Sequence, residues 1–428
     1  MAEKPSITII GLGYVGLPLA VHLAKYFKVT GFDIHINRIK ELQEGYDKTG
    51  EVTSPELRNS TLHLTSDVNE LIGHNIHIIT VPTPVDENNT PDLTPIRKAS
   101  DMIGKIIETG NIVVYESTVY PGVTEDICGP ILEKCSGLKC GKDFFLGYSP
   151  ERINPGDREH TVDAITKVVA GQTVAVSEML SNVYGSMNGD KIFVAKDIKT
   201  AEAAKVIENA QRDINIAFVN EISIIFQKLG ISVYDVLEAA GTKWNFLNFQ
   251  PGLVGGHCIG VDPYYLAHCA KSFGHDPKVI LSGRSTNESM SSAVSTAIHQ
   301  SLKAKNPEIS RPRTLILGLT FKEDVPDLRN TKITDIITDF EALGHIVDVH
   351  DPMADPKEAD QFFNISLKPS LETEDPYDCI IGAVPHQGYL NLTSASIEQL
   401  VKPSGLIADM KGMWRKRQFA QHYSYWCL

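Results

Sequence analysis

The first half of the chain alternates short apolar runs with stretches in which apolar residues recur at helical spacing. The apolar runs are rich in β-branched residues and lie at 7–10, 28–32, 74–81 and 111–116. The amphipathic stretches lie at 15–26, 94–108 and 123–133. Strands that alternate with helices form parallel sheets covered by helices on both faces. The pattern therefore predicts an α/β fold built on a doubly wound parallel sheet.

A longer periodic stretch covers residues 200–227, which contain neither Pro nor Gly, and Gly230 follows it. A helix of ~28 residues is ~42 Å long at 1.5 Å per residue, longer than one domain needs. Its apolar residues lie on more than one face, with Phe218 and Ile225 alongside Val206. We therefore expect this helix to build a homodimer interface. Burial between two domains of one chain is the alternative.

After a polar, Pro-containing boundary, the chain again alternates short apolar runs with amphipathic stretches, as it does in its first half. The second set of elements is expected at 314–319, 333–343, 346–351 and 377–385. The two ends of the chain thus look like two copies of one mononucleotide-binding half. We predict an α/β protein with two Rossmann-like, doubly wound parallel-sheet domains joined by a helical central domain that contains the long helix. The expected boundaries are 1–198, 199–304 and 305–428.

Composition narrows the class of protein. The 428 residues are 42% hydrophobic and 22% charged, within globular norms, and the net charge of −13 disfavours a nucleic-acid surface. No apolar run reaches the ~18 residues of a membrane span, and no signal peptide precedes the first strand, so we expect a cytoplasmic protein without a membrane partner. Seven cysteines without a CxxC pair predict free thiols and no metal site.

A glycine-rich motif, G-L-G-Y-V-G, joins the first strand to the first helix. Gly11 permits the tight turn, Gly13 lets the backbone approach a pyrophosphate, and Gly16 permits close packing. Asp33 ends the second strand, where a carboxylate accepts from ribose hydroxyls and repels a 2′-phosphate. The motif predicts NAD rather than NADP. Arg38 is close enough in sequence to weaken that preference, but we expect it to provide a flat surface beside the adenine or to be solvated.

Three further segments carry unusual chemistry. They are Y-S-P-E-R-I-N-P-G-D at 148–157, the pair Lys205 and Asn209 on one face of the long helix, and P-G-L-V-G-G-H-C-I-G-V-D-P-Y-Y at 251–265. In the last segment Cys258 lies among glycines whose amides can form a nest for developing negative charge.

Each of these features also has a structural reading. A Cys in a turn is more often structural, Asp262 could cap a helix instead of accepting a proton, and Lys205 and Asn209 could be ordinary helix-surface residues.

The motifs together resemble one enzyme family from end to end. They are G-L-G-Y-V-G-L-P, V-P-T-P, Y-E-S-T-V-Y-P-G, S-P-E-R-I-N-P-G, A-A-K-V-I-E-N, G-G-H-C-I-G-V-D-P-Y-Y and F-K-E-D-V-P-D-L-R-N. The chain resembles the UDP-glucose/GDP-mannose dehydrogenases, and among them the bacterial UDP-N-acetylhexosamine 6-dehydrogenases that make capsule and O-antigen precursors. The resemblance implies a four-electron oxidation of a UDP-sugar 6-hydroxymethyl to a carboxylate with two NAD, in a dimer built on the long helix.

The resemblance also assigns residues. It places the catalytic groups at Thr118, Glu151, Lys205, Asn209, Cys258 and Asp262. It places the NAD contacts at Gly11, Gly13, Tyr14, Val15, Gly16, Asp33, Arg38, Pro82, Thr83, Thr118 and Arg329. It places the substrate contacts at Glu151, Arg152, Ile153, Asn154, Lys205, Asn209, Phe246, Phe249, Gly255 and Lys322.

Two departures from the UDP-glucose pattern stand out. Pro155 replaces a second glutamate, and 241–246 lacks the arginine that UDP-glucose enzymes extend across the dimer.

The chemistry of these groups is consistent with two successive oxidations. A water held by Asp262, with Lys205 stabilising an alkoxide, would serve the alcohol step, and addition of the Cys258 thiolate would prepare the aldehyde for the second. Glu151 would then be the base for thioester hydrolysis, and Arg415 is a weak candidate for a further anion contact. The competing readings are UDP-N-acetylmannosamine or UDP-glucose as substrate, a two-electron hydroxyacid-type dehydrogenase, and a non-catalytic NAD-binding regulator.

Overall fold

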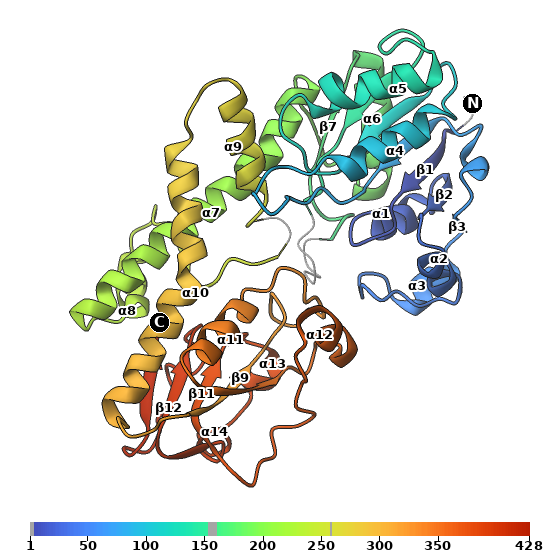
Figure 1. The fold of residues 1–428 in the computed structure, drawn as a ribbon. Coiled ribbons are helices and arrows are strands. Elements are labelled where there is room, and N and C mark those ends of the chain that lie inside the picture. Colours follow the sequence, from blue (N-terminus) through green and yellow to red (C-terminus); the bar gives the residue numbers. More distant parts are fainter. Residues whose placement is uncertain (1–3, 153–160, 257–258) are drawn as a thin grey trace. The chain divides into compact units, whose positions relative to one another are not determined.

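The computed structural model describes residues 4–152, 161–256 and 259–428. The chain divides into two compact units (Figure 1). The N-terminal unit comprises Met1–Asn209 and Val261–Asp276, and the C-terminal unit comprises Ala210–Gly260 and Pro277–Leu428.

The N-terminal unit is built on an eight-stranded sheet with the order β3-β2-β1-β4-β5-β6-β7-β8. Its strands are β1 (Ser6–Ile10), β2 (Lys28–Phe32), β3 (His63–Thr65), β4 (Ile76–Ile79), β5 (Ile112–Tyr115), β6 (Phe145–Tyr148), β7 (Lys167–Gly171) and β8 (Ile192–Val194). Neighbouring strands are parallel except β6 and β7. The strand order reverses between β1 and β4, and this switch point is where doubly wound sheets bind ligands.

Helices cover both faces of this sheet. They are α1 (Gly16–Leu23), α2 (Ile36–Gln43), α3 (Ser54–Asn59), α4 (Thr94–Gly104), α5 (Gly129–Ser136) and α6 (Val174–Asn188). The unit also contains α9 (Asp262–Ser272) and a short 3₁₀ turn at Val68–Leu71. Alternate residues of β5 belong to two separate apolar clusters. Val113 packs with α4 and α5, whereas Val114 packs with α1 and α6. The predicted stretch 123–133 differs in detail, because it starts with a π-helical turn at Val123–Cys128 before α5.

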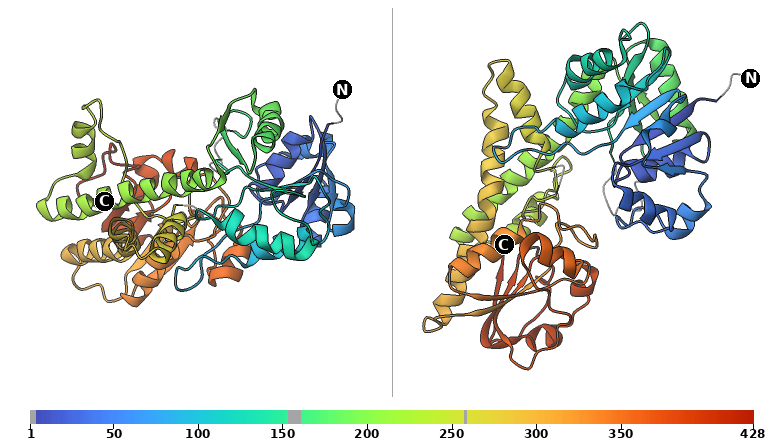
Figure 2. Two further views of the ribbon diagram at one scale, coloured as in Figure 1. Left: turned by 90° about the horizontal axis from the view of Figure 1, so that it is seen from above. Right: turned by 45° about the vertical axis from the view of Figure 1, so that its right-hand side comes forward.

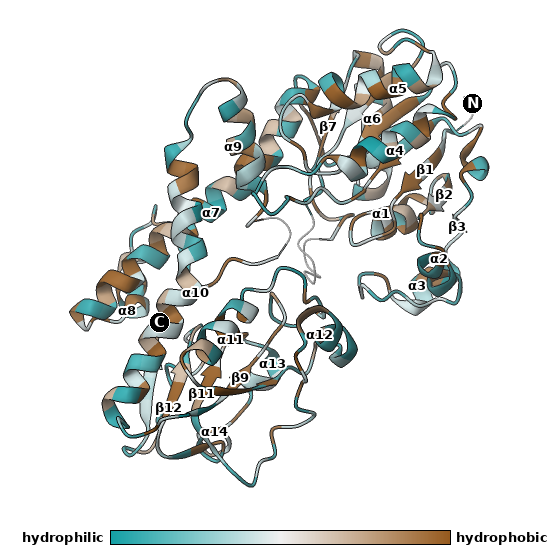
Figure 3. Cartoon of the chain, in the orientation of Figure 1, coloured by the Kyte–Doolittle hydropathy of each residue, from teal (hydrophilic) through white to brown (hydrophobic). Residues whose placement is uncertain are grey.

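The C-terminal unit repeats the plan on a smaller scale (Figure 2). Its all-parallel sheet has the order β10-β9-β11-β12-β13, with β9 (Arg313–Leu317), β10 (Ile346–His350), β11 (Tyr377–Gly382), β12 (Val401–Asp409) and β13 (Ser424–Cys427). Its helices are α8 (Val233–Ala240), α10 (Lys278–Lys305), α11 (Ile333–Ala342), α12 (Pro356–Phe363), α13 (Gln387–Leu390) and α14 (Ser394–Glu398). The central strands β9 and β11 are apolar, brown in Figure 3, and their residues belong to two apolar clusters. The predicted fold class is confirmed.

The long helix α7 spans Ile198–Leu229, 32 residues, and begins in one unit and ends in the other. Gly230, with φ of +69°, follows it, as the sequence predicted. Phe218 and Ile225 remain exposed on α7, with 59% and 47% of their surface accessible, whereas Val219 is buried. In the parts of the chain that the structure describes, no helix is long and apolar enough to cross a membrane.

Candidate active site

The turn after β1 has the geometry of a dinucleotide site. Gly11 has a φ of +98°, and a Cβ on Gly16 would lie 1.9 Å from the Gly11 carbonyl oxygen, so both positions require glycine. Gly13 is exposed, and a Cβ added there would meet no atom within 4 Å. The chain therefore leaves an open approach to its backbone at the N-terminus of α1, which fits a pyrophosphate.

Asp33, at the end of β2, is fixed beside this turn. One carboxylate oxygen accepts from the Leu12 N–H at 3.0 Å and the other from the His35 N–H at 2.9 Å. An ionised carboxylate has about four acceptor positions, so Asp33 retains capacity for ribose hydroxyls.

Arg38 is buried, and the expectation of a solvated side chain was wrong. Its guanidinium donates to Asp47 at 2.7 Å and to the Leu12 carbonyl at 3.0 Å. The positive charge of Arg38 is paired with Asp47 within the chain. It therefore no longer gives a reason to expect that the site tolerates the 2′-phosphate of NADP.

The other predicted cofactor positions follow the carboxyl ends of neighbouring strands. Tyr14 and Val15 belong to the first turn, Pro82 and Thr83 follow β4, and Thr118 follows β5. These strand ends meet at one edge of the sheet. Arg329 lies in the C-terminal unit instead, where its guanidinium contacts the Asp327 carboxylate at 2.8 Å.

A buried polar cluster joins α7 to the start of α9 within the N-terminal unit. The Asn209 amide donates to the Asp262 carboxylate at 2.5 Å, and Lys205, one helical turn before Asn209, is also buried. Burial raises the pKa of Asp262 to about 6, against the opposing effects of Lys205 and Asn209. Lys205 and Asn209 are therefore not helix-surface residues. Asp262 makes no capping hydrogen bond, since the cap of α9 is Val261.

Glu151 lies in a second buried polar cluster of this unit. Lys167, at the start of β7, donates to Glu116 at 2.7 Å and to Glu151 at 3.2 Å, and Tyr184 donates to Glu116 at 2.5 Å. Sequence reasoning missed Glu116, Lys167 and Tyr184. A signal was present, because a charged residue lies directly beside an apolar strand run in two places, with Glu116 after β5 and Lys167 at the first position of β7.

The neighbouring Arg152 pairs with Glu208 of α7 at 3.2 Å. Three predicted residues, Ile153, Asn154 and Cys258, lie outside the described residues.

The C-terminal unit has an analogous turn with a different acid. Asp351 follows β10 as Asp33 follows β2, but it accepts from four backbone N–H groups, those of Leu319, Thr320, Met353 and Ala354, at 2.6–3.0 Å. His386 contacts it at 3.1 Å. Although burial opposes ionisation, the hydrogen bond from His386 and these amides hold the pKa of Asp351 at about 2. Its acceptor capacity is used, so this half is not built to grip a ribose as Asp33 can.

Lys322 lies at the carboxyl edge of this second sheet. A small cavity of about 50 Å³ brings it together with Gly255, Lys332 and Lys411. Burial lowers the pKa of Lys411, a residue that sequence reasoning did not identify. Gly256 donates its N–H to the Asn330 carbonyl at 3.2 Å, which attaches the glycine-rich loop to this edge.

Three other predicted residues of the C-terminal unit have different surroundings. Phe246 and Phe249 pack against an apolar cluster of α7 and α8. Arg415 pairs with Asp235 at 3.2 Å and Glu238 at 3.0 Å, and the further anion contact suggested for it stays a prediction.

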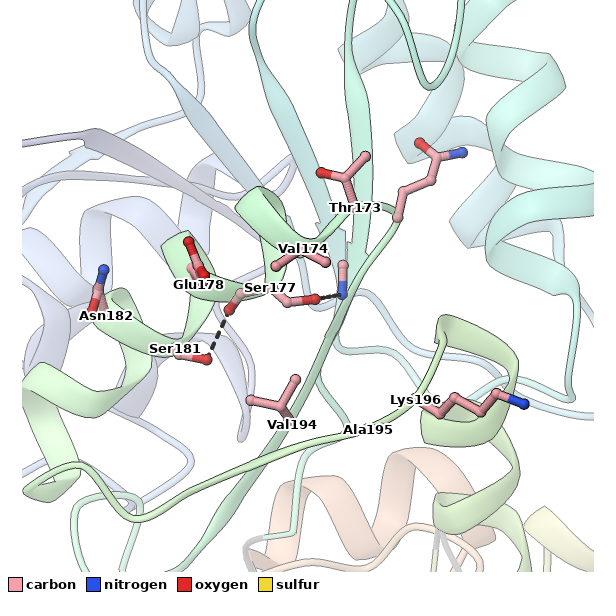
Figure 4. Close-up of a pocket in the computed structure, with 11 residues that line it drawn as sticks. Thr173, Val174, Ser177, Glu178, Ser181, Asn182, Val194, Ala195 and Lys196 are labelled. Carbon is pink, nitrogen blue, oxygen red and sulfur yellow. Dashed lines mark hydrogen bonds between the residues drawn. The ribbon is translucent and has the colours of Figure 1, made fainter.

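A larger cavity, of about 680 Å³, lies elsewhere, between β7, β8 and α6 (Figure 4). None of the predicted residues lines it. Its hydroxyls are engaged within the chain, since Ser177 accepts from the Gly171 N–H at 2.9 Å and Ser181 donates to the Ser177 carbonyl at 2.7 Å.

Comparison with known proteins identifies the family. Residues 5–188 match the NAD binding domain of the UDP-glucose/GDP-mannose dehydrogenase family, 199–289 its central domain and 315–416 its UDP binding domain. The chain belongs to this family. The NAD and UDP-sugar predictions are thereby confirmed at the level of the family, and the first turn of the N-terminal unit fits NAD.

Full-length relatives support this placement. The chain is 51% identical to protein CapL of Staphylococcus aureus over 99% of both chains. It is 49% identical to a UDP-N-acetyl-D-glucosamine 6-dehydrogenase of Pseudomonas aeruginosa, over 95% of this chain and 96% of the relative.

Solved structures agree. The UDP-D-ManNAc dehydrogenase of Pyrococcus horikoshii has a TM-score of 0.88 at 27% identity, over 98% of both chains. The UDP-N-acetyl-mannosamine dehydrogenase Cap5O of Staphylococcus aureus has a TM-score of 0.84 at 29% identity, over 99% of this chain and 98% of that one.

Proposed function

We propose that this protein oxidises the 6-hydroxymethyl group of a UDP-N-acetylhexosamine, UDP-GlcNAc or UDP-GalNAc, to a carboxylate. The observation that carries the reaction class is the buried Lys205, Asn209 and Asp262 cluster, in the same unit as a turn that fits NAD. A buried site with one ammonium and one carboxylate can stabilise an alkoxide and hold the water that accepts its proton. When bound, NAD supplies the chemistry that these side chains lack, the acceptance of a hydride in each oxidation.

In the alcohol step, Lys205 stabilises the developing alkoxide and Asp262, held by Asn209, orients the water that takes the hydroxyl proton. The raised pKa of Asp262, about 6, keeps it basic enough to exchange that proton near neutral pH. Thr118, after β5, contributes to the same edge of the sheet.

In the aldehyde step, the Cys258 thiolate adds to the carbonyl carbon to give a thiohemiacetal, whose oxidation leaves a thioester on the sulfur. Glu151 then takes a proton from water as its oxygen attacks the thioester carbonyl. The carbon–sulfur bond breaks, the uronate leaves, and the thiolate is regenerated.

The substrate assignment rests on relatives and on the UDP-binding domain. Relatives at 49% and 47% identity carry the name UDP-N-acetyl-D-glucosamine 6-dehydrogenase. We assign Lys322 and Gly255 to the nucleotide, and the predicted residues Arg152, Ile153, Asn154, Phe246 and Phe249 to the sugar. The product would serve a surface polysaccharide, as the name CapL suggests. UDP-ManNAc and UDP-glucose are the alternatives, the first because relatives at 31–32% identity carry that name.

We also propose a cytoplasmic homodimer built on α7. The exposed Phe218 and Ile225 support this assembly, because exposed apolar residues on a long helix gain free energy when a second copy covers them. The three-part division at 1–198, 199–304 and 305–428 belongs to the same proposal.

Steady-state kinetics test the substrate and the electron count together. We expect kcat/KM to be highest for UDP-GlcNAc or UDP-GalNAc, and two NADH to form per sugar. A preference for UDP-glucose would refute the substrate assignment. One NADH per sugar would identify a two-electron dehydrogenase, and none would identify a regulator.

A further inference from the structure

Three ionisable side chains of the N-terminal unit are buried together, with Lys167 in contact with both Glu116 and Glu151. The assignments made from the family use only Glu151. Lys167, Glu116 and Glu151 expose almost none of their side-chain surface. They come from three separate segments: Lys167 is the first residue of β7, Glu116 directly follows β5, and Glu151 lies in the segment after β6. The Lys167 ammonium donates to both carboxylates and also lies 3.5 Å from the Pro150 carbonyl oxygen.

Removing charges from water is costly, and a hydrophobic replacement often stabilises a fold more than a buried ion pair does. A cluster of one ammonium and two carboxylates is therefore a poor way to stabilise the sheet. The desolvation cost of the cluster is understandable if the cluster fixes the charge and orientation of a reacting group. Among the three side chains, only Glu151 has a proposed part in the reaction, as the base in thioester hydrolysis.

We infer that Lys167 and Glu116 are positioning residues for Glu151, which they hold in place and whose basicity they set during thioester hydrolysis. The inference rests on the proposed function. Lys167 favours the ionised carboxylate of Glu151, whereas the adjacent Glu116 disfavours it and shares the same ammonium. Tyr184 donates to the carboxylate oxygen of Glu116 that Lys167 does not contact, and the Lys167 ammonium lies 5.3 Å from the centre of the Tyr184 ring.

The other groups that face Glu151 are few among the described residues. The Arg152 N–H donates to the Glu151 carboxylate, and the Arg152 guanidinium is paired with Glu208 at 3.2 Å. Burial raises the pKa of Glu116, whereas the contacts with the Lys167 ammonium and the Tyr184 hydroxyl favour its ionised form.

Two single variants should move the pH dependence of hydrolysis in opposite directions. Glu116→Gln removes a negative charge, so that Glu151 becomes the only carboxylate paired with Lys167. The acid limb of the pH–rate profile for hydrolysis should therefore shift to lower pH by about one unit. Lys167→Met removes the positive charge, so the limb should shift to higher pH by about one to two units, with slower hydrolysis at neutral pH. The double variant Glu116→Gln/Lys167→Met should shift the limb less than Lys167→Met alone. Lys167→Arg, which keeps the charge, should restore most of the rate.

The measurement is rapid quench of the full-length protein with UDP-GlcNAc and excess NAD across pH 5.5–9. Uronic acid release reports hydrolysis, intact-protein mass reports the covalent sugar on Cys258, and the first NADH reports the alcohol step. We expect the alcohol step to change less than twofold while the covalent sugar accumulates in Lys167→Met.

The outcomes separate this inference from the proposed function. If the wild type forms no NADH with any UDP-N-acetylhexosamine, the proposed function fails. If the wild type forms two NADH per sugar but the acid limb is the same in both single variants, the inference is overturned. A loss of both steps in parallel, with no shift of the limb in the double variant, would likewise overturn it and assign the cluster to folding. Opposite shifts of the limb, with recovery in Lys167→Arg, would support it.

Discussion

Replacing Asp262 with Asn should change how the stability of the protein depends on pH, and the wild type is the reference for that change. The substitution keeps the volume of a buried side chain and leaves an amide oxygen that can still accept from Asn209. It removes a carboxyl group whose pKa burial raises from 3.8 to about 6. The comparison of the two proteins therefore isolates the free energy of ionising this one group.

The sign follows from the direction of the shift. Because the folded state holds the proton more tightly than the unfolded chain, the wild type gains stability relative to Asp262→Asn in acid. That contribution is complete below about pH 3.8 and is lost as the pH rises through about 6. A shift of two units corresponds to about 3 kcal/mol, of which about 2 kcal/mol falls between pH 4.5 and 7.5.

Scanning calorimetry of both proteins between pH 4.5 and 7.5 measures this change. A change of 1 kcal/mol moves Tm by about 2–4 °C in a unit of this size, so the Tm difference should change by about 4–8 °C in favour of the variant as pH rises. The control Asp92→Asn should show a nearly constant Tm difference over this range, because the Thr94 hydroxyl and N–H hold the pKa of Asp92 below its usual value of 3.8 and the group is therefore ionised in both the folded and the unfolded state. A Tm difference for Asp262→Asn that stays constant across this range would refute the reasoning.

Four further outcomes are expected. Gly16→Ala should destabilise the protein by about 1–3 kcal/mol, because its Cβ meets the Gly11 carbonyl, whereas Gly13→Ala should fold normally and bind NAD more weakly; thermal melts and calorimetric titration distinguish them. Asp33→Asn should weaken NAD binding about tenfold and reduce discrimination against NADP, and unchanged titrations with both cofactors would contradict this. Phe218→Glu should sediment as a monomer at micromolar concentration where the wild type is dimeric, and a monomeric wild type would refute the dimer. Cys258→Ser should bind UDP-sugar but turn over on the order of 10³-fold more slowly, and near wild-type release of uronic acid in rapid quench would show that the nucleophile lies elsewhere.

Local periodicity predicted most elements of the fold, because each strand and helix carries its own pattern. The predicted run 28–32 is β2 without change, and Gly230 ends α7 where expected. The pattern did not predict that β7 runs antiparallel to β6, since strand direction depends on partners distant in sequence.

Long-range pairing also explains what was missed in the candidate site. Lys167 and Glu116 are 51 residues apart and meet only because β5, β6 and β7 are neighbours in the sheet. The motif that contains Glu151 includes neither Lys167 nor Glu116, so it gives no indication that they are its partners. The ion pair between Arg38 and Asp47 is closer in sequence, yet it depends on a turn that brings Asp47 back over α2, so a solvated arginine was the wrong expectation.

The two sheets show how one folding pattern can be adapted to two nucleotide ligands. In both, an acid at the end of the second strand accepts from the turn after the first strand, so the acid stabilises the turn in each case. Asp33 accepts two backbone N–H groups, which leaves it able to bind the ribose of NAD. Asp351 accepts four and also contacts His386, so it serves the fold alone. A ligand of the C-terminal unit must then be held by other groups, and the lysines beside the glycine-rich loop have the charge to hold a diphosphate. An acid at the end of the second strand therefore does not identify a dinucleotide site by its sequence position alone. The number of hydrogen bonds that it already accepts within the fold must also be known.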